Sequence, residues 1–185
     1  MQNREWLRQQ TRNLFEAKLE INLDRTIQTK VHGVIPHHYF SAASSECREM
    51  FIEGHFYGCI TLAQAVAEGL SRFVADVNGI TGLSKDPVNR VSKLHKRGFI
   101  SAEARGAFKK IWSDDRNIYH HLNENIETDP ERLEGRAEEC VNALCEIESE
   151  LFAFDIVEGA ISPKRPEYWP KVEENMMMAF LRLDR

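Results

Sequence analysis

Apolar residues recur at intervals of three and four positions along much of the chain, the spacing expected of helices that bury one face. In the segment from about 56 to 77, five apolar residues fall on one side: Ile60, Ala63, Ala67, Leu70 and Val74. A last long helix is predicted after Pro130, with a seam whose spacing alternates between four and three: Leu133, Ala137, Cys140, Leu144, Ile147, Leu151 and Phe154. Such a seam is typical of a helix that packs on a neighbour at a shallow angle, within the fold or across a dimer.

Capping residues mark the ends of these and other helices. Asp86, followed by proline, predicts the start of a helix that runs to Arg97. Ser101 predicts the start of the next helix, over residues 102 to 112. The last long helix is expected to begin at a capping box formed by Thr128 and Glu131.

The two ends of the chain have weaker patterns. Residues 3 to 21 are predicted to form an amphipathic helix, with these residues toward one side: Trp6, Leu7, Leu14, Phe15 and Leu19. Residues 22 to 43 are expected to be irregular, with a short strand or an ordered arm, and a short helix is predicted from Ser44 to about Gly54. The segment after Gly159 is too rich in proline for helix, and is either packed coil or a docking segment.

Taken together, these patterns predict an all-α protein, an antiparallel helical bundle with an N-terminal helix and an irregular C-terminal tail. We expect an N-terminal helix and arm over residues 1–40, the bundle over residues 41–159 and the tail over residues 160–185. The methionine-rich segment 176–181 is more typical of a core-filling element than of a binding strip.

Composition narrows the cellular setting. A hydrophobic content of 42% and a charged content of 29% are typical of a globular protein in water. No apolar run approaches the roughly 18 residues that would span a membrane, and no signal core follows Met1. The four cysteines show no C-x-x-C spacing, so reduced thiols in a cytoplasmic protein are expected.

The charge is distributed unevenly along the chain. The net charge of −5 argues against a protein that binds nucleic acid with its whole surface. Residues 85 to 110 hold eight lysines or arginines against two acids, and residues 123 to 155 hold eleven acids against two arginines. Solvated helix faces explain such blocks in general, but the region between them contains the strongest candidate for chemistry.

That candidate is the segment from Asp114 to Asn123, which brings together Arg116, Asn117, His120 and His121. On a helix, residues four apart face the same way, whereas Arg116 and His121 diverge by about 140°. The arginine therefore bends back toward the histidine, or it meets a histidine of a second copy of the chain.

These residue types suit metal-independent cleavage of RNA. A histidine can remove the proton of the ribose 2′-hydroxyl, whose oxygen then attacks the adjacent phosphorus. The guanidinium of Arg116 suits the charge on the phosphoryl oxygens, and Asn117 can orient an imidazole. His120, or a second copy's His121, can protonate the leaving oxygen. Lys109 and Lys110, one turn before the segment, are candidate contacts for the RNA backbone.

The segment resembles the R-x4-6-H signature of the HEPN domain family, in the form Arg116-Asn117-x-x-x-His121 with a polar residue after the arginine. Two further stretches are similar to that family: residues 54–68, which look like its early helices, and residues 94–101, which look like its connection before the motif. The resemblance covers roughly residues 41 to 155.

Membership of that family would imply a helical bundle that forms a homodimer, with the arginine and histidine of both copies in one cleft. It would also imply a metal-independent endoribonuclease with no cofactor, in toxin–antitoxin or defence systems, often held by an antitoxin or another regulatory protein. A subset of the family has a tyrosine two places after the histidine, used in a modification switch. Asn123 stands there in this chain, so that kind of regulation is not expected.

Other interpretations stay open. The loose motif is also met by three further pairs: Arg25 with His32, Arg48 with His55 and Arg90 with His95. His120 and His121 could be a surface pair beside acidic neighbours, or could join acids in a metal site, although no H-x-x-x-H spacing supports a metal. The chain could also be a non-catalytic helical module that binds a protein or a nucleotide.

Overall fold

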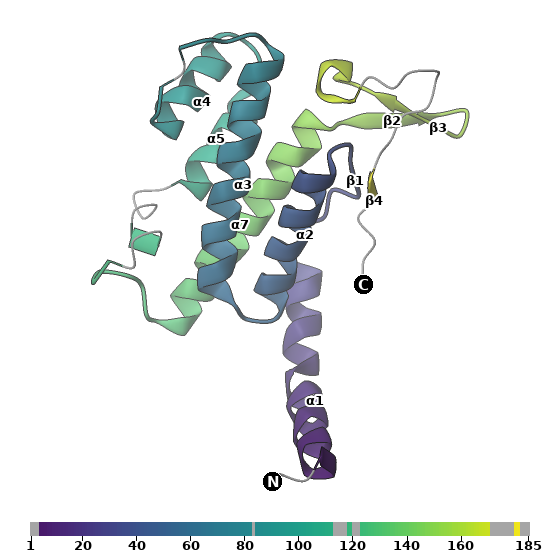
Figure 1. Cartoon of the computed structure of the whole chain (residues 1–185), viewed down its shortest axis with the longest axis vertical. Coiled ribbons are helices and arrows are strands. Elements are labelled where there is room, and N and C mark those ends of the chain that lie inside the picture. The colour runs from purple at the N-terminus through teal and green to yellow at the C-terminus, as the bar shows by residue number, and fades with distance from the viewer. Residues whose placement is uncertain (1–3, 83, 113–117, 120–122, 171–179, 182–185) are drawn as a thin grey trace.

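The prediction of an all-α bundle is confirmed by a computed structural model of the chain (Figure 1). The structure describes residues 4–82, 84–112, 118–119, 123–170 and 180–181. Its helices in these ranges are α1 (Arg4–Gln28), α2 (His38–Ile52), α3 (Phe56–Val77), α4 (Pro87–Lys96), α5 (Ala102–Ile111) and α7 (Pro130–Leu151).

The core lies where α2, α3, α5 and α7 meet, and α7 touches each of the other three. Figure 1 shows α2, α3 and α7 side by side, with α4 and α5 at one end of the bundle. The apolar side predicted for α3 is fully buried, and so is the predicted seam of α7 as far as Leu151. Burying each large apolar side chain stabilises the fold by about 1.5–3 kcal/mol, so these two faces hold the bundle together.

Two helices extend beyond their predicted limits near the N-terminus. α1 continues to Gln28, and α2 begins at His38 rather than Ser44, so the expectation of an irregular segment over 22–43 was wrong for much of its length. No glycine or proline interrupts residues 22–28, and Arg25 anchors this turn to the bundle. α2 starts two residues after Pro36, in time to bury Phe40. A short strand, β1 (Val34–Ile35), lies between them.

The end of the last long helix was also predicted wrongly. α7 stops at Leu151, and Phe154 lies in strand β2 (Phe154–Val157), which pairs antiparallel with β3 (Ala160–Pro163). Glu158 and Gly159 join the strands with φ values of 51° and 81°, the left-handed backbone of a tight hairpin turn. Gly159 thus makes a hairpin turn rather than a helix end.

The tail beyond the hairpin packs onto the bundle. A 3-10 helix, η1 (Pro166–Tyr168), buries Tyr168 and is followed by the buried Trp169. Strand β4 (Phe180–Leu181) pairs antiparallel with β1. Of the methionine-rich segment, residues 176–179 lie outside the described residues. Residues 160–170 pack on the bundle. This favours a role of their aromatic side chains in packing over a role in docking.

Capping residues were predicted correctly at two helices and wrongly at a third. Asp86 accepts hydrogen bonds from the first N–H groups of α4, and Ser101 accepts one from Ala104 in α5. At α7 the cap is Asp129, whose carboxylate accepts from the N–H of Arg132 at 3.0 Å, not Thr128. Proline occupies the first helical position here, so the residue immediately before it becomes the cap. None of the helices in the described ranges has the length and apolar character needed to cross a membrane.

The cap of α7 can be tested directly. We expect Asp129→Ala to lower the free energy of unfolding by about 0.5–2 kcal/mol, because the N–H of Arg132 loses its acceptor. Thr128→Ala, at an exposed neighbouring position, is the matched control and should leave stability unchanged. Urea denaturation monitored by circular dichroism measures the free energy of unfolding of both variants. A larger loss of stability in Thr128→Ala than in Asp129→Ala would show that Thr128 caps the helix.

Candidate functional site

The predicted catalytic residues Arg116, Asn117, His120 and His121 lie outside the described residues. The structure does describe what lies on both sides of them and two residues within the segment, Ile118 and Tyr119. The segment is attached to the bundle at three places: the end of α5, Tyr119 in the middle of the segment, and the loop that leads to α7.

The middle of the segment is fastened to the bundle by an aromatic side chain. Tyr119 is only 5% exposed, and its ring lies 6.2 Å from that of Tyr57 in α3. Ile118 is half-buried, and its carbonyl oxygen accepts a hydrogen bond from the N–H of Asn123 at 3.0 Å. Tyr119 lies between two polar clusters of the sequence, and its burial was not predicted.

The same helix holds the loop that follows. The hydroxyl of Tyr57 donates to the carbonyl oxygen of Glu127 at 2.7 Å. α3 thus contacts the segment at Tyr119 and again just before α7. Tyr57 lies within the stretch 54–68 singled out from the sequence, but its role in holding this loop was not predicted.

The end of α5, directly before the segment, is tied to two other helices. Trp112 donates from its indole nitrogen to the carbonyl oxygen of Gln64 in α3 at 3.3 Å and stacks on Phe108. Arg136 of α7 donates to the carbonyl oxygen of Ile111 at 3.1 Å. A cation at a helix C-terminus is favoured by the helix dipole, so this contact fixes the entry into the segment.

The two candidate phosphate-contacting lysines differ in their surroundings. Lys109 and Lys110 are both exposed on the last turn of α5. The ammonium of Lys110 lies 3.8 Å from the carboxylate of Glu146 in α7, whereas Lys109 has no ion-pair partner among the described residues. Lys109 is therefore the better placed of the two to attract a phosphate.

The charge blocks partly neutralise each other, because α5 packs on α7. Arg90, counted in the basic block, is only 3% exposed and donates to the hydroxyl of Ser71 at 3.1 Å. In the acidic block, Glu134 pairs with Arg25 and Glu148 is buried. A basic surface remains at the exposed cations Lys85, Lys96, Arg97, Lys109 and Lys110.

The three competing motif matches contain arginines with structural contacts. Arg25 donates to the carboxylate of Glu134 and to the carbonyl oxygen of Ile52. Arg48 donates to the hydroxyl of Thr29 at 3.1 Å. The buried Arg90 holds the loop before α4 by donating to two of its carbonyl oxygens. Each of these guanidiniums contributes to packing, which weakens the three alternative pairs.

Most described histidine side chains also bond to the backbone. His32, His37 and His95 each have a ring nitrogen within 3.2 Å of a carbonyl oxygen. Among the described residues His55 is exposed and has no hydrogen-bond partner for its ring. It offers a control for the predicted catalytic histidine.

The cysteines make no reactive site. Cys47 and Cys59 lie with their sulfur atoms 3.7 Å apart in the core. A hydrogen bond between the Cys59 thiol and the sulfur of Cys47, and then burial, raise the pKa of Cys59 far above its ordinary value. The thiol is therefore protonated and shielded, as suits a core residue. Among the described residues no cluster of three or more His, Cys, Asp or Glu is placed to hold a metal ion.

Two shallow hollows lie on the described surface. One of about 500 Å³ is lined along α7 by Arg132, Gly135, Arg136, Glu138, Glu139 and Asn142. Another of about 470 Å³ is lined by Arg72, Asp76, Ser84, Lys85 and Arg90. Their linings mix cations with acids and include none of the large apolar side chains typical of a small-molecule site.

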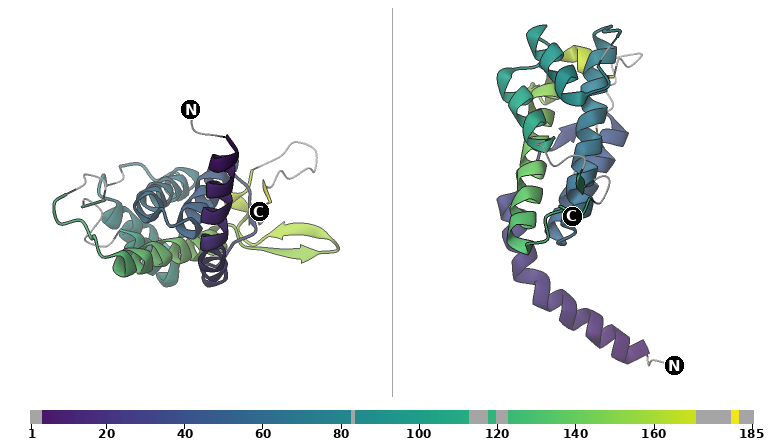
Figure 2. Two further views of the ribbon diagram at one scale, coloured as in Figure 1. Left: turned by 90° about the horizontal axis from the view of Figure 1, so that it is seen from below. Right: turned by 90° about the vertical axis from the view of Figure 1, so that its left-hand side faces the viewer.

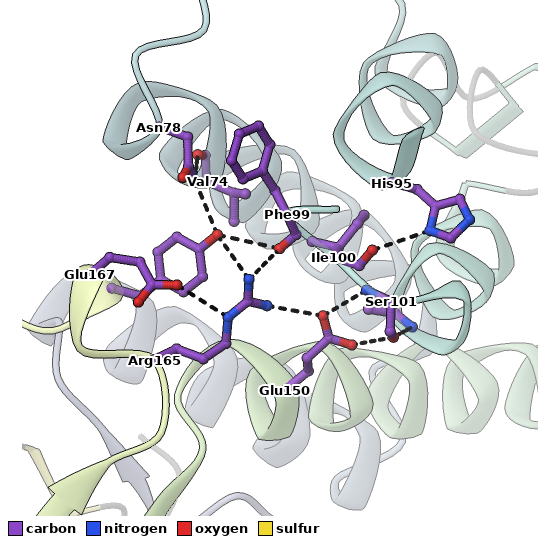
Figure 3. A network of polar contacts seen from close by, with 11 residues as sticks. Val74, Asn78, His95, Phe99, Ile100, Ser101, Glu150, Arg165 and Glu167 are labelled. Carbon is purple, nitrogen blue, oxygen red and sulfur yellow. Dashed lines mark hydrogen bonds and ion pairs between the residues drawn. The ribbon is translucent and has the colours of Figure 1, made fainter. Parts of the chain in front are cut away.

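A polar network holds the tail against the bundle (Figure 3). Arg165 donates to the carboxylate of Glu150 at 3.2 Å and to the carbonyl oxygen of Phe99 at 2.6 Å. Glu150 also accepts from the backbone N–H and the hydroxyl of Ser101, at the start of α5. The network thus joins the tail, α7 and the stretch before α5 whose sequence resembles the HEPN connection.

Comparison of the chain with protein-family models, with curated proteins and with solved structures found no significant match.

The phenol of Tyr168 makes the stability contributed by the Arg165 network depend on pH. Burial raises its pKa above the ordinary value of 10.0, although a hydrogen bond from Asn78 opposes the shift. The folded state therefore keeps the proton that the unfolded state loses, and this contribution to stability declines as pH rises above about 10.

We expect Tyr168→Phe to lower the free energy of unfolding at neutral pH by about 1 kcal/mol, because three hydrogen-bond partners, Asn78, Phe99 and Arg165, lose their contact. The difference in stability between the two proteins should shrink between pH 10 and 11, because only the wild type has a phenolic proton at position 168 to lose. Denaturant unfolding at both pH values measures this. A difference that grows with pH would contradict the assignment.

Proposed function

We propose that this protein is a metal-independent endoribonuclease of the HEPN type, with a site formed across a homodimer and a role in a toxin–antitoxin or defence system. The observation that carries the proposal is the strict Arg116-Asn117-x-x-x-His121 motif, in a segment held between α5 and α7. RNA is the proposed substrate, and an antitoxin or regulatory protein the proposed partner.

Three structural facts support the motif over its competitors. The arginines of the other three matches have packing contacts. Buried Tyr119 fixes the middle of the segment, as a site that must hold its groups in a defined geometry requires. Exposed cations of α4 and α5, Lys96, Lys109 and Lys110, precede the segment in the chain and can attract an RNA backbone.

In the proposed reaction, His121 removes the proton of a ribose 2′-hydroxyl and that oxygen attacks the neighbouring phosphorus. The bond to the 5′ oxygen breaks, and His120 or the second copy's His121 supplies the proton that this oxygen takes. The guanidinium of Arg116 balances the charge on the phosphoryl oxygens, and Asn117 orients the imidazole. The products are a 2′,3′-cyclic phosphate and a 5′-hydroxyl, so neither metal nor cofactor enters the balance.

The alternative, a non-catalytic binding module, was motivated partly by the aromatic, proline-rich tail. Tyr168 and Trp169 are buried against the bundle, so the described part of the tail offers no aromatic surface for a partner. The net negative charge of the chain still favours this alternative. However, acidic residues such as Glu134, Glu146 and Glu150 already have cationic partners within the chain.

An RNA-cleavage assay in the presence of a chelator tests the proposal. We expect His121→Ala to lower the rate by about 10²–10⁴-fold, because proton transfer is lost. Arg116→Ala should lower it by about 10²–10³-fold, because the developing charge loses its donors. Lys109→Ala should chiefly weaken RNA binding and reduce its salt dependence.

His55→Ala is the matched control, since it removes an exposed histidine from a competing match and should leave the rate unchanged. All variants should retain the helical circular dichroism of the wild type. Unchanged cleavage in Arg116→Ala or His121→Ala, or cleavage that depends on added metal, would refute the proposal.

A further inference from the structure

α1 is a long helix that buries none of its residues (Figure 2). Figure 2 shows it projecting away from the bundle as an arm. Its exposed large apolar side chains are Trp6, Leu7, Leu14, Phe15, Leu19, Ile21, Leu23 and Ile27. Leu14 and Phe15, near its middle, are 64% and 65% exposed. A single helix with this much apolar surface in water is unstable alone, so the arm needs a partner.

Side-chain contacts attach the last turns of α1 to the bundle. Asn22 donates to Glu53, and Arg25 donates to Glu134 and lies over the ring of Phe56. The helix before Asn22 extends over about 27 Å, at 1.5 Å per residue. That length is free to lie along another helix.

We propose that α1 pairs with the α1 of a second copy of the chain, antiparallel, about a twofold axis beside Leu14. Leu7, Leu14 and Ile21 are seven residues apart and form one stripe along the helix. In an antiparallel pair centred on Leu14, Leu7 meets the second copy's Ile21 and Leu14 meets its own equivalent. The stripe is symmetric about that residue, as a self-complementary interface requires.

The charges of α1 select the antiparallel direction. Residues 4–13 of α1 hold three arginines (Arg4, Arg8 and Arg12) against Glu5, and residues 15–24 hold three acids (Glu16, Glu20 and Asp24) against Lys18. A twofold axis at Leu14 lays the positive first half of one helix along the negative second half of the other, whereas a parallel pair would set the two arginine-rich halves beside each other. Such exposed charges add little affinity, but they disfavour the wrong orientation.

This pairing joins the arms and not the bundles. From Leu14 to Arg25 the helix rises about 16 Å, so the two bundles lie at opposite ends of the paired arms. It is a different contact from the homodimer of the proposed function, and it stands or fails independently of ribonuclease activity.

Disulfide trapping of the full chain tests the pairing. The four native cysteines are buried, so a cysteine introduced in α1 is the accessible thiol. Leu14→Cys should form a covalent dimer on mild oxidation, because helices packed 8–10 Å apart bring facing residues within reach of a disulfide. Glu16→Cys is the matched control: it lies on the far side of the helix, and we expect little dimer.

Two further variants decide the orientation. Leu7→Cys alone should give little dimer, but its mixture with Ile21→Cys should give the mixed disulfide. Covalent dimer from Leu7→Cys alone would show a parallel pair, and dimer from Glu16→Cys would show a different face; either result overturns the proposal. A monomer by light scattering overturns it too, including one that sediments with anionic phospholipid vesicles, since the occupant would then be a membrane surface.

Discussion

The burial of α7 is the constraint on which the rest of the structure depends. It packs against α2, α3 and α5, and its other residues hold segments on both sides of the proposed site. Arg136 holds the end of α5, Glu150 holds Ser101 and the tail, and Asp129 caps the helix at the exit from the motif segment. A polar residue in the seam would therefore disturb the site as well as the core.

The bundle could be predicted because its signals are local. The apolar faces of α3 and α7 and the caps Asp86 and Ser101 depend on spacing and neighbours along the chain, and each is as expected. The errors lie where tertiary contacts decide. α1 continues through Arg25, which pairs with Glu134 109 residues away. Phe154 fits a helical seam by spacing, but a hairpin turn at Glu158 and Gly159 makes it part of a strand.

The site itself was only partly accessible to sequence reasoning. The motif was found by residue type and spacing, and its four polar residues lie outside the described ranges. Its attachment through Tyr119 and Tyr57 was not predicted, because their contact joins segments that are distant in the sequence. The charge blocks were attributed to solvated helix faces, and the packing of α5 on α7 brings Lys110 of one block beside Glu146 of the other.

The proposed function requires that a guanidinium and an imidazole from two copies act on one phosphodiester. Mixing the purified Arg116→Ala and His121→Ala proteins, each at least about 10²-fold slower than the wild type alone, is the direct test. In a mixed dimer one chain keeps Arg116, the other keeps His121, and both keep His120 to protonate the leaving oxygen, so we expect RNA cleavage in chelator to return. A mixture that exchanges subunits, as shown by differently tagged chains, yet cleaves as slowly as its components would contradict a site shared between two copies with His120 as the acid.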